Sequence, residues 1–447
     1  MVTTAIEART APAPAGSRAA ARLLEMEARA LLTRLGRVKP FALQETMLPA
    51  AALSPAAQVA IERLLVLGRL GLRSRVLAYL RWLEGPGRHT SPAEMQRRYT
   101  RLRLAFNNAL SQFDTFSSVI TQRSENETGV WLSGLDSLAA DALKLPGVTM
   151  SRPEVICYLD RGPGAAIRRA RTRIPGGALN PVAIIRVPRE RMVGHGIGSS
   201  LVHEVGHQGA VLLGLVKSLR AELDRRGAAA PPSDRPAWQL WRSWVSEIAA
   251  DLWSVAILGI GATVGLMGVV SLPSWYVFRL SAGDPHPIPW IRVRLSCALG
   301  RALYPHPQWD ELARIWETLY PPAQMRPASR RTFDALLRTL PACVETILSH
   351  RPPTLGGRPL RTAFPTEERT PQELARLHRR WRTKPGEMRD AAPTLAFAVL
   401  GQARYRGAIN AREESRIIGN LLTFWALKST LVLAEICAAR VDAARTG

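Results

Sequence analysis

The chain has 447 residues, of which 47% are hydrophobic and 21% are charged. This length allows two or three modest domains, and the composition excludes disorder as the state of the whole chain. The net charge of +24 would attract nucleic acid or another acidic partner. The basic residues are spread along the sequence without a nucleic-acid-binding motif, so a nucleic-acid partner is an alternative that we do not favour.

Residues 1–20 are rich in Ala, Pro and Thr, and they lack the basic stretch and apolar run of a secretory signal. We expect them to form a flexible tail. The four cysteines are Cys157, Cys297, Cys343 and Cys437. Their wide spacing argues against a disulfide framework and against a thiolate zinc site, and it predicts a cytoplasmic location.

Apolar spacing indicates helices in most of the chain. In residues 21–150 the apolar residues recur at helical spacing, as in AIERLLVLGRLGLRSRVLAYLRWL. Two short β-branched runs, EVICYLD and VAIIRV, indicate strands within residues 151–300. Residues 301–447 are again mostly helical, apart from a Pro-rich loop at residues 351–371. The sequence therefore predicts a mainly α protein with a small β-sheet.

Two long helices should carry the residues of chemical interest. The first begins near Ser199 or Ser200, either of which can cap it, and ends near Gly227, which can adopt a left-handed conformation. The second begins after Asp234, with Pro236 in its first turn, and continues to residue 259.

The first of these helices contains the motif HEVGH, in which His203 and His207 are four residues apart. Four residues advance a helix by about 400°, so the two side chains project within about 40° of each other and suit two ligands of one ion. Glu204 then lies beside the ion without binding it and can act as general base and acid. With 8 histidines in the chain, a shuffled sequence would contain this pattern roughly 0.01 times. The alternative is that both histidines are bonded into a core.

The second helix offers the third ligand that a catalytic zinc site requires. Glu247 and Asp251 are four residues apart and share a helix face. They lie among Trp and Ile residues, and buried carboxylates need a cation or a hydrogen-bond partner. We expect one of the two carboxylates to bind zinc and the other to accept the outer N–H of a ligand histidine. A solvated acidic pair is the alternative.

These motifs resemble those of the gluzincin metallopeptidases, in which an HExxH helix is followed by a helix with a Glu ligand. The sequence EIAAD at residues 247–251 is similar to the family of CAAX prenyl proteases and bacterial membrane heat-shock proteases. That family also has a His-Pro with an Arg six residues after the His, which His286 and Arg292 match in DPHPIPWIR. Ile288 stands where the family usually has a second proline. The resemblance covers residues 182–292 and implies a zincin-like core with zinc as its cofactor. It also implies that Glu247 is the third zinc ligand, which leaves Asp251 to accept the outer N–H of a ligand histidine.

Leu213 stands where metzincins place a third histidine, which excludes that group. In enzymes of the gluzincin type, the strand before the metal helix lies along the cleft, so VAIIRV would pair as an edge strand with an extended substrate. Gly206 would let another backbone approach closely beneath the metal. His195 is a reserve ligand.

An uncharged run extends from residue 252 to residue 278, and residues 252–272 are long enough to span a bilayer. Membrane association through this segment is therefore an alternative. The run contains four glycines and begins directly after Asp251, which favours a buried helix and turn behind the metal site.

The sequence thus predicts a zinc-dependent metalloendopeptidase that acts on a peptide or protein substrate. Tyr276, His286 and Arg292 are candidate donors to the oxyanion that forms during hydrolysis. The alternatives are a helical scaffold with a structural metal site and a basic nucleic-acid-binding protein. Glu204 discriminates between an enzyme and a scaffold, because a structural site has no use for an unligated glutamate beside the metal.

Overall fold

The computed structural model describes residues 15–37, 47–148, 151–161, 164–173, 178–189, 194–281, 283–325 and 327–446. These residues fall into two compact units. The first unit comprises Met1–Thr46, Pro55–Thr121 and Arg171–Pro181, and the second comprises Met47–Ser54, Gln122–Ala170 and Val182–Gly447.

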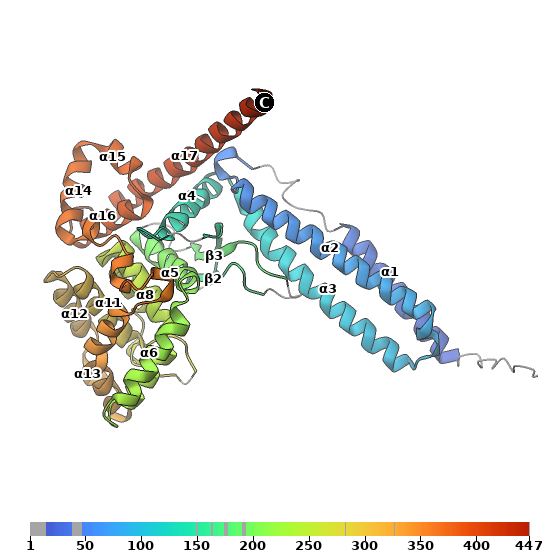
Figure 1. Ribbon diagram of the computed structural model, residues 1–447, viewed down its shortest axis with the longest axis horizontal. Coiled ribbons are helices and arrows are strands. Elements are labelled where there is room, and N and C mark those ends of the chain that lie inside the picture. Colours follow the sequence, from blue (N-terminus) through green and yellow to red (C-terminus); the bar gives the residue numbers. More distant parts are fainter. Residues whose placement is uncertain are drawn as a thin grey trace, which may run out of the picture. The chain divides into compact units, whose positions relative to one another are not determined.

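The first unit is built from three long helices, α1 (Ala15–Arg37), α2 (Pro55–Glu84) and α3 (Pro92–Thr121) (Figure 1). Apolar residues at helical spacing, such as Leu24 and Leu31, fill the space between them. The tail was predicted to extend to residue 20, whereas α1 already begins at Ala15. Residues 1–14 of the predicted tail lie outside the described residues.

The second unit contains a three-stranded sheet formed by β1 (Val155–Asp160), β2 (Ala166–Arg168) and β3 (Ala183–Pro188). The strand order is β1-β3-β2, in which β1 is parallel and β2 antiparallel to β3. The two predicted strands are confirmed, and the short β2 was not predicted. The expectation that VAIIRV is an edge strand is wrong, because β3 is paired on both sides. Its nearly continuous burial is typical of such a central strand.

Each of the two long helices predicted for the site is divided into two. The first begins at His195, earlier than predicted, and forms α5 (His195–Leu212) and α6 (Leu215–Ala229). Gly214 separates them in the left-handed conformation. The second begins after Asp234 as predicted and forms α7 (Arg235–Ser243) and α8 (Val245–Leu258).

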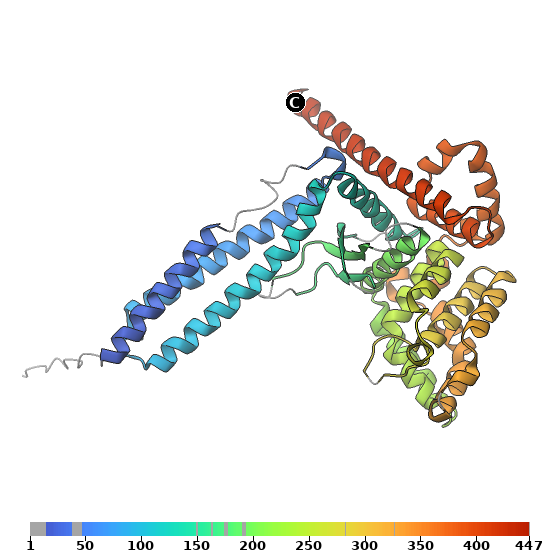
Figure 2. The ribbon, with the colours of Figure 1, turned by 180° about the vertical axis from the view of Figure 1, so that it is seen from behind.

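Helices also make up most of the rest of the second unit, so the prediction of a mainly α protein with a small β-sheet is confirmed. The remaining helices are α4 (Asn126–Ala142), α9 (Ile260–Val270), α10 (Ser274–Val277), α11 (Pro289–Leu303), α12 (Gln308–Leu319), α13 (Pro327–Ser349), α14 (Pro371–Thr383), α15 (Pro385–Asp390), α16 (Pro393–Tyr405) and α17 (Ala411–Thr446). Figures 1 and 2 show α14, α15 and α16 gathered around the first half of α17.

The uncharged run after Asp251 does not form a single helix. Gly259, with a φ of 60°, separates α8 from α9, and most side chains of both helices are buried. Within the part of the chain that the structure describes, no helix has the length and apolar character needed to cross a bilayer.

Small residues allow α5 and α8 to pack closely, as was predicted for Gly206. A Cβ atom added at Gly206 would lie 2.8 Å from Trp253 Cβ and 2.9 Å from the Ala250 Cα atom. Real Cβ atoms do not approach other atoms so closely, and the Ala250 backbone cannot rotate away. Gly206 therefore sets the distance between the helix with the two histidines and the helix with the two carboxylates.

We predict that Gly206→Ala lowers the free energy of unfolding by about 1–3 kcal/mol, because the added methyl group overpacks the contact between α5 and α8. Gly196→Ala is the matched control on the same helix, since a Cβ at Gly196 meets nothing within 4 Å. The control should be neutral or more stable by at most about 1 kcal/mol. Urea denaturation measures both, and equal stabilities would contradict the packing role of Gly206.

Candidate metal centre

Helices α5 and α8 bring three potential metal ligands together. His203 and His207 lie one turn apart on α5, and Glu247 lies in the first turn of α8. Ligand atoms of the three side chains all lie within 4.8 Å of one another. Elsewhere in the described residues, no other group of three such side chains is this close. Two imidazoles and one carboxylate form a donor set that suits zinc and related divalent metals.

The Glu247 carboxylate lies between the two imidazole rings. His203 Nε2 is 3.3 Å from Glu247 Oε2, and His207 Nε2 is 3.3 Å from Glu247 Oε1. Glu247 Oε2 is buried and forms no hydrogen bond of normal geometry. An ionised oxygen in this state is costly, and a cation among the three side chains would remove the cost. The residues therefore fit a divalent metal.

Asp251 and Arg292 support His203, which Asp251 contacts through the ring nitrogen that does not face Glu247. Asp251 Oδ1 lies 2.8 Å from His203 Nδ1, so it is placed to accept the outer N–H of that ring. Arg292, on α11, donates from Nε to Asp251 Oδ2 at 2.7 Å and from Nη2 to Oδ1 at 2.8 Å. Such a forked pair holds both side chains in one orientation. Asp251 thereby holds His203 in one orientation, and Arg292 in turn holds Asp251.

The buried charges determine where protons reside. Burial alone would lower the pKa of His203, but the Asp251 and Glu247 carboxylates raise it to about 9. Burial and the charge of His203 lower the pKa of His207 to about 4. Burial would raise the pKa of Glu247, but its contact with His203 and the charge of Arg292 lower it to about 2. Near neutral pH, His203 therefore carries a proton on the nitrogen that faces Glu247, and a bound metal would displace this proton.

Glu204 is buried beside this group, and burial followed by the proximity of Glu247 raises its carboxyl pKa. It lines a cavity of about 130 Å³ together with His203, Asp251 and Arg292. Ala262, Leu266 and Val269 of α9 also line the cavity. Glu204 thus faces a cavity that His203, one of the three potential ligands, also lines.

His286 also lines this cavity, and about half of its side chain is exposed. Its Nε2 lies 3.4 Å from Glu247 Oε2, and its Nδ1 lies 2.9 Å from Asp284 Oδ1. Tyr276 does not line the cavity, and Arg279 lies over its ring instead. His195 opens α5, but its side chain lies outside the described residues.

Three residues of the site were not predicted from the sequence. Ser246 Oγ lies 3.3 Å from the outer nitrogen of His207, and Asp284 contacts His286 as described above. Gln208 is buried, and its side chain accepts a hydrogen bond of 2.9 Å from the Ala170 N–H. Ser246 directly precedes Glu247, and Gln208 directly follows His207. This proximity in the sequence was the signal that could have indicated them.

The short strand β2 is connected to the cavity at its first end and to α5 after its last residue. Gly164 and Ala165, directly before β2, line the cavity, and Gln208 of α5 holds the segment after it. Because β3 is central, β2 provides the edge of the sheet next to the metal helix.

Comparisons of the chain with protein-family models, with curated proteins and with solved structures found no match.

We predict that the apparent zinc affinity rises about tenfold per pH unit between about pH 6 and 8. In this range His207 is neutral and Glu247 is ionised, while His203, with a pKa of about 9, must lose one proton to bind a metal. Competition with a chelator of known affinity measures this slope. Asp251→Asn should flatten it, because that change removes the carboxylate that raises the His203 pKa. An affinity independent of pH in the wild type would contradict the assignment of His203 as a ligand.

Proposed function

We propose that the protein is a zinc-dependent peptide hydrolase in which His203, His207 and Glu247 hold the metal. The observation that carries the proposal is the position of Glu204. It lines the same cavity as His203, one of the three ligands, and does not itself belong to the ligand group. A purely structural site needs no such glutamate, whereas hydrolysis needs a base at this position.

When bound, zinc would supply Lewis-acid activation of water and polarisation of the substrate carbonyl. Glu204 would take the proton from the attacking water and return it to the leaving amine. Its raised pKa suits this exchange, because a base with a pKa closer to neutrality can both accept and release a proton.

The surrounding residues would position these groups. Asp251 and Arg292 would act through His203, which they orient, and they are therefore positioning residues. His286 is exposed on the cavity side and would donate to the negative charge that develops on the carbonyl oxygen. This assigns different roles to His286 and Arg292, which were both predicted as oxyanion donors.

The substrate is proposed to be an extended peptide that pairs with the edge of β2, since Gly164 and Ala165 connect that strand to the cavity. The cavity would hold one uncharged side chain. Its α9 wall is apolar, and the Ser199 and Ser254 hydroxyls donate to backbone carbonyls at 2.9 Å and 3.3 Å. An apolar cavity of about 150 Å³ accommodates a benzene-sized molecule, so the volume of about 130 Å³ suits a medium-sized side chain.

We predict that Glu247→Ala reduces zinc content much more than Asp251→Ala. The first change removes a metal bond, whereas loss of a residue that orients a ligand typically costs on the order of 10–100-fold in metal affinity. Elemental analysis after gel filtration, together with titration of zinc, measures the difference. Equal affinities in the two variants would contradict the roles given to Glu247 and Asp251.

We predict that Glu204→Gln keeps the zinc and the thermal stability of the wild type but reduces peptide hydrolysis by about 10²- to 10⁴-fold. Glutamine has nearly the same shape but cannot accept a proton. Cleavage of a peptide library by the wild type and the variant measures the loss. The exposed Glu127→Gln on α4 is the control and should cleave at the wild-type rate.

Undiminished cleavage by Glu204→Gln with zinc bound would contradict the mechanism. A protein that retains zinc but cleaves no member of the library would favour the scaffold with a structural metal instead.

A further inference from the structure

A cavity in the second unit lies between α14, α15 and the first half of α17, and we call it the α17 groove. Its volume is about 720 Å³, within the range of small-molecule binding sites. None of its lining residues belongs to the metal centre. Its floor consists of apolar side chains that are less than 10% exposed, namely Trp381, Met388, Ile409 and Leu421.

The rim of the α17 groove carries an excess of positive charge. Arg382, Arg389 and Arg416 are exposed at the rim, and within the described residues none of them forms an ion pair with a carboxylate. The acid in the lining, Glu413, accepts a hydrogen bond of 2.9 Å from the Asn410 N–H at the start of α17.

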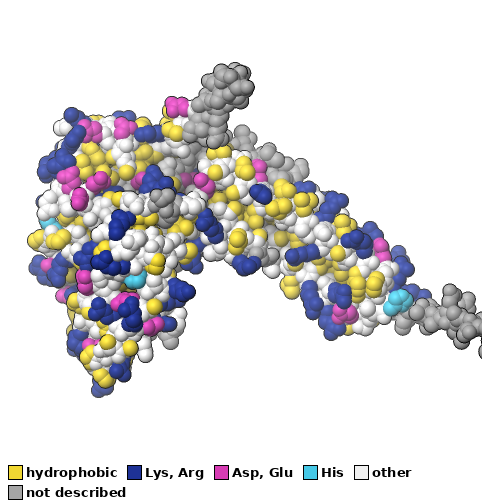
Figure 3. Space-filling model, viewed as in Figure 1, with side chains coloured by type: hydrophobic (Ala, Val, Ile, Leu, Met, Phe, Trp, Pro, Cys, Tyr) yellow, Lys and Arg dark blue, Asp and Glu magenta, His cyan; other side chains and the backbone are white. Residues whose placement is uncertain are grey.

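Two acidic residues next to the α17 groove form ion pairs with basic residues outside its lining. Glu387 pairs with Arg380 at 2.6 Å, and Asp390 pairs with Lys428 at 3.2 Å. The apolar floor is therefore bordered by three arginines and one carboxylate, so positive charge is in excess at the rim. Figure 3 shows hydrophobic side chains over α14 and α15 with both basic and acidic side chains around them.

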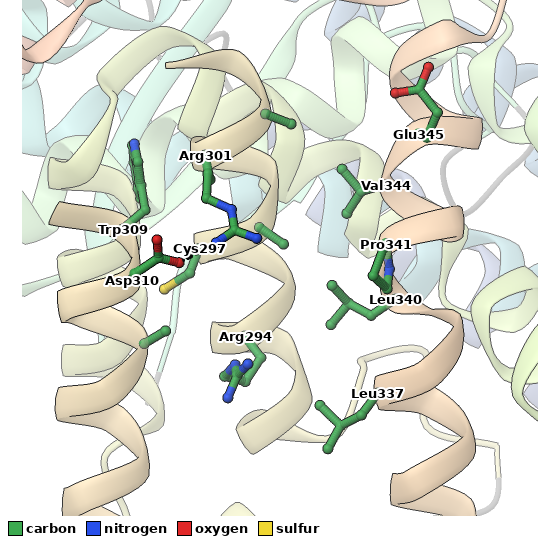
Figure 4. A pocket seen from close by; sticks show the side chains of 13 residues that line it. Arg294, Cys297, Arg301, Trp309, Asp310, Leu337, Leu340, Pro341, Val344 and Glu345 are labelled. Atoms are coloured by element: carbon green, nitrogen blue, oxygen red, sulfur yellow. Dashed lines mark hydrogen bonds and ion pairs between the residues drawn. The ribbon is translucent and has the colours of Figure 1, made fainter. Parts of the chain in front are cut away.

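Another cavity, of about 440 Å³ between α11, α12 and α13, differs in this respect (Figure 4). Its two arginines are paired with acids, Arg301 with Asp310 and Arg294 with Glu317. Glu345 in its wall is paired with Arg361 at 2.7 Å. The charges of that cavity are balanced within the protein, unlike those of the α17 groove.

We propose that the α17 groove binds a free long-chain carboxylate, with the chain on the apolar floor and the carboxylate at the arginines. Guanidinium groups bind carboxylates through paired, charge-assisted hydrogen bonds. A single acyl chain can reach a concave floor that is less than 10% exposed, whereas the flat surface of a bilayer cannot. The proposal is independent of the metal centre, because no residue is shared.

The test is calorimetric titration of the full-length protein with dodecanoate and with dodecanol, both below their aggregation concentrations. Dodecanoate should bind at one saturable site, at least about tenfold more tightly than dodecanol, because hydrogen bonds to charged groups are worth this much. From octanoate to dodecanoate, each added methylene should tighten binding about fourfold. Equal affinities for dodecanoate and dodecanol, or the absence of saturable binding, would overturn the proposal.

Variants locate the site. The double variant Arg382→Gln/Arg416→Gln should lose the preference for dodecanoate over dodecanol. Arg412→Gln is the matched control, since Arg412 is exposed on α17 but does not line the groove. Ile417→Trp should weaken the binding of both ligands by filling the groove. Circular dichroism spectra confirm that each variant is folded.

An equal loss of preference in the control and the double variant would show only a general effect of charge and would overturn the site. Vesicles of phosphatidylglycerol serve as the second arm, because their lipids carry the same combination of acyl chain and anion. Binding to these vesicles without binding of dodecanoate would assign the arginines to a membrane surface and overturn the proposal.

Discussion

Two carboxylates are buried on one turn of α8, and the structure around them supplies the positive charge that this burial requires. Asp251 receives it from Arg292 through a forked pair and from His203 through a short contact. Glu247 has histidine and arginine nitrogens only at 3.3–3.5 Å from its buried oxygen. The Asp251 carboxylate is therefore fully satisfied by its partners, whereas the Glu247 carboxylate is not. This asymmetry divides the pair into one group that orients and one group that remains available to bind a metal.

The positions of these charges depend on packing. Glycine at position 206 and the small Ala250 let α5 and α8 lie in direct contact, so the histidines of one helix meet the acids of the other. The same contact places Trp253 beneath α5, where its indole N–H donates to the Ala142 carbonyl of α4 at 2.8 Å. A wider separation of α5 and α8 would take the histidine partners away from both acids. The electrostatics of the site and the packing of the second unit therefore support each other.

The sequence predicted what local spacing determines. Residues four apart on a helix must share a face, so the proximity of His203 to His207 and of Glu247 to Asp251 followed from the sequence alone. The strands around Ile156 and Ile184 followed from β-branched runs. Their roles in binding and catalysis remain predictions, as does the zincin-like character of the core.

Features that depend on distant parts of the chain were not predictable in this way. The order of the strands is set by tertiary packing, and the three residues of β2 are too few to produce a pattern. The helix breaks at Gly214 and Trp244 arise within sequences whose apolar spacing continues across the break. The pairing of Arg292 with Asp251 joins α11 to α8, and no spacing within either helix indicates it.

The close contact at Gly206 also bears on how far the sequence of the motif can vary. The pattern HExxH leaves two positions unspecified, but in this protein Val205 is fully buried and Gly206 has no room for a methyl group. Both unspecified positions are thus fixed by the core of the protein, independently of any chemistry. Proteins that share this arrangement should be found more readily by the motif with a small residue at its fourth position than by the two histidines and the glutamate alone.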